Sequence, residues 1–209
     1  MRAAAFLTAC FLGLAATSAQ AQVIVLGNGI GSACWRAAEF GTGSMNEGFK
    51  MCTDALATTS LSLRDKAGTY LNRAVIRLRA GDNAGALADA DQAIRIIDMG
   101  EAHVNRGAAL INLMRPADAL QAINTGIEKG TSKMHLVLYN RASAKFLTGD
   151  VRGSYYDYRM AADLRPDLPM LQSALTQFQV IRRPAQGAQN VDDMVDDVVA
   201  LGNPAIRSR

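Results

Sequence analysis

The tripeptides Asn72-Arg73-Ala74, Asn105-Arg106-Gly107 and Asn140-Arg141-Ala142 recur at intervals of 33 and 35 residues. An interval of this size is typical of chains built from stacked pairs of helices. After each tripeptide, small residues follow at the same two offsets, so each repeat has three small positions. These positions hold Ala74, Gly107 and Ala142, then Ala86, Ala119 and Ser154, and then Ala93, Gly126 and Ala161. Small side chains let antiparallel helices approach closely and let neighbouring pairs stack.

The breaks between the expected helices fall at matching places in the repeats. Gly81-Asp82 and Gly149-Asp150 each join a residue that ends a helix to an N-cap residue that begins the next one. Pro116 stands at the first turn of the matching helix in the middle repeat, where proline is tolerated. Gly130 and Pro166 close the second and third repeats. The sequence therefore predicts an all-α fold made of antiparallel helix pairs.

Two cysteines, Cys34 and Cys52, flank an expected hairpin that precedes the repeats. Gly41 can end its first helix, and Ser44 with Glu47 forms a capping box that begins its second helix. The turn lies midway between the cysteines, so an antiparallel hairpin brings the two sulfurs level. We expect a structural disulfide. A redox pair is the weaker alternative, because the C-x-x-C spacing that lowers a thiol pKa is missing.

The repeats resemble the tetratricopeptide repeat (TPR) family across residues 67–166, with units that begin at Ala67, Gly100 and His135. The resemblance implies a right-handed α-solenoid domain over residues 34–182, with about three TPR units. The cysteine hairpin would be a divergent leading unit. The segment from Leu168 to Arg182 would be the C-terminal capping helix, with the apolar residues Leu171, Leu175 and Phe178 on one face.

In TPR proteins the first helices of the units line a concave groove, and the resemblance implies peptide-binding positions here. The apolar candidates are Leu71, Val75, Leu78, Val104, Ile111, Tyr139 and Phe146. A groove of this character fits a partner segment with hydrophobic anchors. Asn72, Asn105 and Asn140 are further candidates, since a carboxamide can both donate to and accept from a peptide backbone. The same asparagines could equally bond between neighbouring helices.

Two of the repeated arginines have acidic residues sixteen positions later, on the expected partner helix. Arg73 is matched in this way with Asp89, and Arg141 with Asp157, which predicts structural ion pairs. Arg106 departs from the rule, because the corresponding residue is Ala122.

The first 21 residues have the pattern of a signal peptide. Arg2 precedes an apolar stretch over residues 3–16, and Ala19-Gln20-Ala21 is a small-x-small cleavage site. A lipoprotein site at Leu7–Cys10 is the less favoured alternative, because it would divide the apolar stretch. We therefore expect cleavage before Gln22, an extended arm over residues 22–33, and a periplasmic or secreted protein.

Other function classes fit the sequence less well. A formal net charge of +3 is too small for a dedicated nucleic-acid binder. Gly27–Gly31 follows an apolar run like a dinucleotide-binding turn, but its glycine spacing fails the pattern. His103 and His135 lack ligand partners at suitable spacing, so no metal site and no cofactor are expected.

Residues 183–209 are expected to form a flexible tail. Within it, apolar residues alternate with aspartates over residues 191–198, enough for a short amphipathic helix. A frayed tail is one reading, and docking of the segment into the groove of its own chain or of a second copy is the other. The favoured function is a noncatalytic periplasmic adaptor that binds a peptide or helix of an envelope protein. A homo-oligomeric scaffold is the alternative, and a nucleotide-binding or thiol-redox enzyme is the less favoured third.

Overall fold

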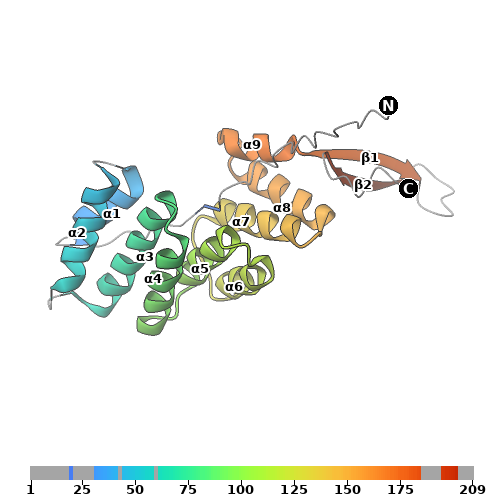
Figure 1. Cartoon of the computed structure of the whole chain (residues 1–209). Helices are drawn as coiled ribbons and strands as arrows, with labels where there is room; N and C mark the ends of the chain where they lie inside the picture. The colour runs from blue at the N-terminus through green and yellow to red at the C-terminus, as the bar shows by residue number, and fades with distance from the viewer. Residues whose placement is uncertain (1–18, 21–30, 42–43, 59–60, 185–193, 202–209) are drawn as a thin grey trace, which may run out of the picture.

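The computed structural model describes residues 19–20, 31–41, 44–58, 61–184 and 194–201, and it shows a row of helix pairs with a β-hairpin at one end (Figure 1). The described helices are α1 Gly31–Phe40, α2 Met45–Ala57, α3 Leu63–Arg79, α4 Asn83–Ile96, α5 Gly100–Asn112, α6 Pro116–Glu128, α7 Met134–Leu147, α8 Val151–Leu164 and α9 Pro169–Leu175. The strands are β1 Phe178–Pro184 and β2 Met194–Ala200. Most of the predicted signal peptide and arm lies outside the described residues, and α1 already begins at Gly31.

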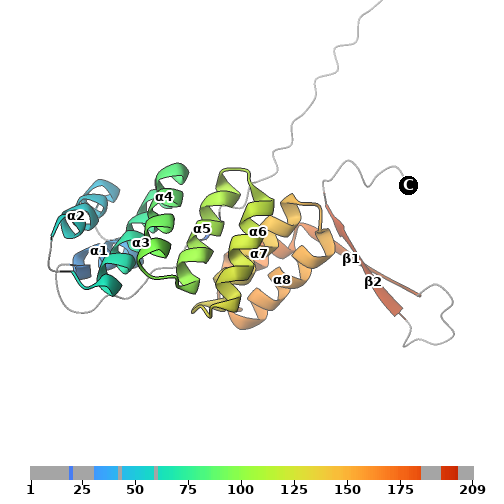
Figure 2. The same ribbon diagram turned by 90° about the horizontal axis from the view of Figure 1, so that it is seen from below.

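The helices pack as the antiparallel pairs that the repeats predict. α3 packs on α4, α5 on α6 and α7 on α8, and α1 with α2 forms a further pair ahead of them. The first helices of successive units also contact one another, α3 with α5 and α5 with α7. Figure 2 shows the same succession from below. The predicted α-solenoid of antiparallel helix pairs is confirmed.

The helix boundaries follow from the turn residues. The Asp82 carboxylate accepts the N–H of Gly85 at 2.9 Å, and the Asp150 carboxylate accepts the N–H of Gly153 at 2.8 Å. Each aspartate therefore caps the second helix of its unit. The glycines before them, Gly81 and Gly149, have φ of 79° and 89°, a backbone conformation that residues with a Cβ rarely adopt.

The small residues of the repeats lie where helices touch. All nine of the small positions are buried. A methyl group added at Gly107 would lie 2.5 Å from Cγ1 of Ile123 on the partner helix α6. The side-chain size at these positions therefore limits how closely the helices of a pair approach.

The predicted disulfide joins α1 to α2. Cys34 and Cys52 are bonded, with their Cα atoms 4.6 Å apart, and both are fully buried. They share an apolar cluster with Val75 and Ile76 of α3. The disulfide thus holds the leading hairpin in the form that packs against the first repeat.

The predicted capping helix is shorter than expected. Helix α9 ends at Leu175 instead of Arg182, and strand β1 begins at Phe178. The sequence after Phe178 contains Val180 and Ile181, whose branched Cβ atoms favour a strand. Phe178 still covers the last repeat, with its ring centroid 5.8 Å from that of Phe146.

The possible amphipathic helix of the tail is a strand, so the helix prediction was wrong. β2 pairs antiparallel with β1, with Val180 opposite Val198 and Arg182 opposite Asp196. The valines of the segment fit this structure, because valine favours strands. Residues 194–200 therefore pair with β1 and do not form the helix for which docking in a groove was considered.

Candidate functional site

Asn140, one of the predicted peptide-binding asparagines, holds a segment of main chain. Its carboxamide Oδ1 accepts the N–H of Gln20 at 2.7 Å, and its Nδ2 donates to the carbonyl oxygen of Gln20. The Asn140 side chain stands on α7 and is fully buried. One carboxamide therefore satisfies both backbone groups of a single residue.

A second carboxamide extends this contact by one residue. Oδ1 of Asn112, the last residue of α5, accepts the N–H of Ala19 at 3.2 Å. Nδ2 of Asn112 donates to Oδ1 of Asn83 on α4 at 3.1 Å. The bond to Asn83 fixes the orientation of the Asn112 carboxamide, so that its Oδ1 faces the N–H of Ala19. Figure 1 shows residues 19–20 as a short blue segment beside the helices in the middle of the row.

Ala19 belongs to an apolar cluster formed by residues of α5, α6 and α7. It is 7% exposed and lies in one cluster with Val104, Ala108 and Ile111 of α5 and Val137 of α7. We call Asn112, Asn140 and this apolar patch the main-chain seat. The seat combines three backbone hydrogen bonds from two carboxamides with a buried place for the side chain of Ala19.

The structure distributes the apolar candidates over several clusters. Val104 and Ile111 lie in the main-chain seat. Leu71 packs with Ala67, Ala90 and other alanines, and Val75 packs with the disulfide. Leu78 lies partly buried against the cluster of the seat, whereas Tyr139 and Phe146 lie in the C-terminal cluster around Phe178. Asn72 and Asn105 occupy the same place in α3 and α5 as Asn140 in α7, and both are fully buried.

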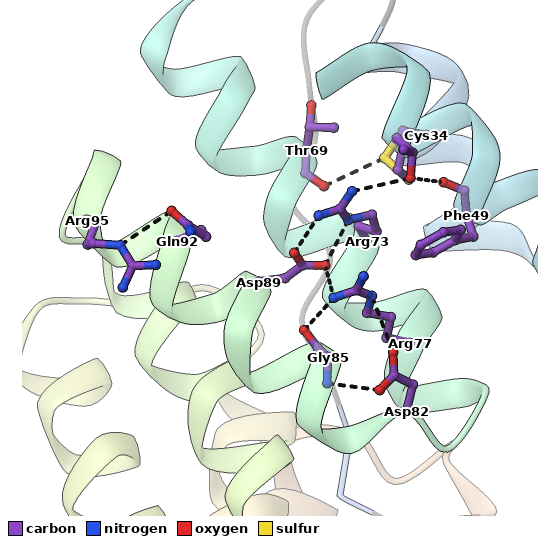
Figure 3. Close-up of polar contacts among 12 residues, drawn as sticks. Cys34, Phe49, Thr69, Arg73, Arg77, Asp82, Gly85, Asp89, Gln92 and Arg95 are labelled. Carbon is purple, nitrogen blue, oxygen red and sulfur yellow. Dashed lines mark hydrogen bonds and ion pairs between the residues drawn. A yellow bond between two sulfur atoms is a disulfide. The ribbon is translucent and has the colours of Figure 1, made fainter. Parts of the chain in front are cut away.

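The repeated arginines form the predicted ion pairs. Figure 3 shows the first of them, in which Nε and Nη2 of Arg73 donate to the two oxygens of Asp89 at 2.9 and 2.7 Å. Arg77 also reaches Asp89 at 3.2 Å, and both guanidinium groups lie over the ring of Phe49. The hydrogen bond to Asp89 raises the pKa of Arg73 above its ordinary value. These contacts tie α2, α3 and α4 together.

The arginines of the third and second units that correspond to Arg73 form different ion pairs from each other. Arg141 binds both oxygens of Asp157 at 2.7 Å, and Lys145 reaches the same carboxylate at 2.9 Å. Arg106, which has no partner on its own second helix, turns to Asp91 of α4 at 2.9 Å. The charged pairs therefore link helices within and between units, and they lie apart from the main-chain seat.

His103 and Asp98 form a further polar contact, at the start of α5. Nε2 of His103 lies 2.6 Å from Oδ1 of Asp98, and hydrogen bonds from Lys129 and His103 lower the pKa of Asp98. The part of the chain that the structure describes contains no group of three His, Cys, Asp or Glu side chains placed to hold a metal ion. Among the same residues, none of the helices combines the length and the apolar character that crossing a membrane requires.

The arrangement of helices defines the chain as a TPR-like α-solenoid. A solved structure described as "MamA RS-1 ArsTM double mutant", from a TPR-containing protein, is similar to it with a TM-score of 0.54. The similarity covers 71% of this chain and 82% of that chain at 13% sequence identity, so it concerns the fold. The sequence matches no family model and no curated protein.

No binding role was predicted for Asn112, which holds the thirteenth position of its unit. In the other units the equivalent residues are Arg79 and Leu147, so an alignment of the repeats marks Asn112 as a lone carboxamide. The part played by Asn83 was missed. It follows the N-cap Asp82 directly, and a residue next to a cap looks like part of the turn.

Proposed function

We propose that the protein is a noncatalytic adaptor that binds an extended segment of another protein on the concave side of its α-solenoid. The observation that carries this proposal is the pair of hydrogen bonds between the Asn140 carboxamide and the main chain of Gln20. Gln20 lies within the predicted signal peptide, so this contact belongs to the uncleaved chain and serves as an example of how the surface recognises a backbone.

The hydrogen bonds favour an extended segment over a helical one. In an extended residue the N–H and the C=O point to the same side, so one carboxamide can reach both, as a neighbouring strand would. In a helix these groups point in opposite directions along the axis and are already bonded to residues four positions away. A helical partner would leave the donor and the acceptor of Asn140 unsatisfied in a buried place.

The envelope is the compartment that fits this adaptor. The signal-peptide pattern of residues 1–21 predicts export, and disulfides persist in oxidising compartments outside the cytosol. The buried bond between Cys34 and Cys52 is in keeping with that environment. The expected partner is therefore another exported or envelope protein that presents an extended segment.

Site-specific photo-crosslinking in living cells tests the proposal. A photoreactive residue is placed at Leu147, which is exposed and holds the groove position that matches Asn112. A second is placed at Met51, which is exposed on helix α2 of the leading hairpin. We expect Leu147 to capture a defined protein that Met51 does not capture, and Asn140→Ala to reduce that capture.

The matched control is Asn46→Ala, because Asn46 is an exposed asparagine on α2, away from α5 and α7. It should leave capture unchanged. Equal capture from Leu147 and Met51, or capture that Asn140→Ala does not change, would show that the concave side is not the binding surface.

A homo-oligomeric scaffold is a second candidate function. It is favoured by a mainly apolar hollow that includes the exposed side chains of Met134, Met160 and Leu164. The hollow is also lined by Ile127, Leu138, Arg141 and Asp163. A second copy could cover such a surface. Two results together would support this candidate: the molar mass of the protein rises with its concentration, and the Met160→Lys variant stays monomeric at the same concentrations.

A further inference from the structure

Strand β1 has one unpaired edge at the C-terminal end of the solenoid. The sheet has two strands, so β1 pairs with β2 on one side, and among the described residues no strand pairs with its other side. Figure 1 shows the hairpin leaving the row of helices after α9 and extending away from it. An unpaired strand edge presents N–H and C=O groups that can pair with another extended chain.

The register shows which backbone groups face this outer edge. The N–H of Leu201 donates to the carbonyl oxygen of Gln177 at 2.7 Å, which extends the ladder by one hydrogen-bonded pair. Hydrogen-bonded and non-hydrogen-bonded pairs alternate in an antiparallel ladder, so Val180 and Val198 form a non-hydrogen-bonded pair. The N–H and the C=O of Val180 therefore point away from β2, to the outer edge.

The side chains of β1 also suit a further contact. Val180 is 40% exposed and Ile181 is 45% exposed, and successive residues of a strand point to opposite faces. The strand thus exposes a branched apolar side chain on each of its faces. Exposed apolar side chains on an unpaired edge favour pairing with another chain.

A hollow of about 530 Å³ lies beside this strand. Its described lining includes Val180 and Phe178 of β1, Tyr155 of α8 and Leu175 of α9, and it comes from these elements rather than from β2. This lining places the hollow towards the outer edge of β1. Neighbouring strands lie about 4.8 Å apart, so the side chains of a strand added at that edge would reach the hollow.

The charges near the hollow indicate an acidic partner. Strand β1 contains two arginines and no acidic residue, and the aspartates of β2 lie on its other side. Arg159 of α8 lines the hollow, is exposed and makes no ion pair with any residue that the structure describes. Asp163 is the one carboxylate in the described lining. Because opposite charges on neighbouring strands attract, a strand that carries an acidic residue fits this edge better than a basic one.

We propose that the outer edge of β1 and the hollow beside it form a second protein-binding surface, which accepts an antiparallel strand from a partner protein. The added strand carries an apolar residue that enters the hollow. It also carries an acidic residue two positions away, on the same face, that meets Arg159. The backbone of Val180 supplies hydrogen bonds, and the hollow and Arg159 supply selectivity. This surface is separate from the main-chain seat, so the inference goes beyond binding on the concave side.

The first experiment measures residue-resolved amide exchange in the full chain without a ligand. The N–H groups of Gln179 and Ile181 face β2 and should exchange slowly, whereas the N–H of Val180 should exchange nearly as fast as in an unstructured chain. Fast exchange at Gln179 and Ile181 as well would overturn the proposal, because β1 would not be formed.

Slow exchange at Val180 without a ligand would also overturn it, because the edge would already be covered. Protection that falls on dilution would identify a second copy as the cover. Protection that does not change on dilution would identify another segment of the same chain.

The second experiment titrates a peptide into the same full chain. The probe is acetyl-Thr-Asp-Thr-Val-Thr-Leu-Thr-amide, whose aspartate, valine and leucine share one face of an extended strand. At concentrations up to about 1 mM it should slow the exchange of Val180 at least about tenfold and shift the NMR signals of Tyr155 and Phe178. Unchanged exchange of Val180 in the presence of the probe would overturn the proposal.

Two N-methylated probes show whether the backbone pairs. In the proposed arrangement the N–H of the probe's valine faces β1, and the N–H of the threonine that follows points away. Methylation of the valine nitrogen should abolish the effect on Val180, whereas methylation of the threonine nitrogen should retain it. Equal binding of the two methylated probes would rule out strand addition, with the protein itself unaltered.

Substitution of Arg159 shows whether the acidic residue is selected. Arg159→Gln should weaken binding of the probe at least about threefold, and it should not weaken a probe with asparagine in place of aspartate. The matched control is Arg152→Gln, because Arg152 is exposed on the same helix, lies over the ring of Tyr156 and stands outside the described lining of the hollow. Equal effects of the two substitutions would contradict the proposed role of Arg159. Crosslinking from Leu147 tests the concave side independently of these results.

Discussion

The Asp89 carboxylate lies in the fork of the Arg73 guanidinium, with donor–acceptor distances of 2.9 and 2.7 Å. The Asp89 side chain is 3% exposed and that of Arg73 is 14% exposed. A charge pair in this position is shielded from water, so that removal of one partner leaves the other charge unsatisfied.

Asp89→Asn should therefore lower the free energy of unfolding by about 3 kcal/mol, since it removes the counter-charge of both Arg73 and Arg77. Urea unfolding followed by circular dichroism measures the change. The matched control is Asp54→Asn, because Asp54 pairs with Lys50 while both side chains are mostly exposed. It should change stability by less than about 1 kcal/mol. Equal effects of the two substitutions would contradict the account.

Gly107 sets the distance between α5 and α6. Gly107→Ala should destabilise the protein by about 1–3 kcal/mol, because the new methyl group would lie 2.5 Å from Cγ1 of Ile123. Ile123→Ala alone should also destabilise it by leaving a cavity. In the double variant the two changes relieve each other, so a double-mutant cycle should give a favourable coupling of about 1 kcal/mol or more. Strict additivity would show that the methyl group meets no obstacle at Ile123.

The disulfide should stabilise the leading hairpin. It closes a loop with a sequence separation of 18, for which the loss of chain entropy in the unfolded state corresponds to about 3 kcal/mol. Reduction, or the double substitution Cys34→Ala and Cys52→Ala, should lower the melting temperature and speed amide exchange in α1 and α2 most. An unchanged melting temperature in the presence of a reductant that reaches the bond would rule out this role.

His135 should make stability depend on pH. Burial, followed by the nearby charges of Arg165 and Lys133, lowers the pKa of His135 in the folded protein. The unfolded chain therefore binds a proton more readily, and the stability due to the neutral folded imidazole, present above about pH 6.5, is lost as pH falls through the folded pKa. His135→Gln should flatten the fall in melting temperature between about pH 7 and pH 5. Parallel curves for the two proteins would contradict this prediction.

The solenoid could be predicted because its requirements are local and periodic. A small residue such as Ala142 is needed wherever two helices cross, and an N-cap such as Asp150 is needed wherever a helix begins, so both recur with the repeat. The disulfide was also predictable, because a hairpin of two equal helices brings Cys34 and Cys52 level.

The strands and the main-chain seat were harder to predict. The apolar positions Leu171, Leu175 and Phe178 do not distinguish a continuous helix from a helix followed by strand β1. Phe178 packs on the last repeat from the strand, as it would from a helix. The strand is favoured over a helix by its pairing with β2, which comes later in the chain. The sequence around Phe178 alone does not indicate such a pairing. Asn112 contacts Ala19 across 93 residues, and no periodicity connects the two.

The most direct test of main-chain recognition is an NMR measurement of the scalar coupling across the hydrogen bond between Gln20 and Asn140. In isotope-labelled full-length protein, a long-range HNCO spectrum should show a cross-peak between the amide of Gln20 and the side-chain carbonyl carbon of Asn140, which should disappear in Asn140→Ala. Absence of that peak, in a spectrum that shows the helical hydrogen-bond couplings, together with free-chain exchange at Gln20, would contradict the account.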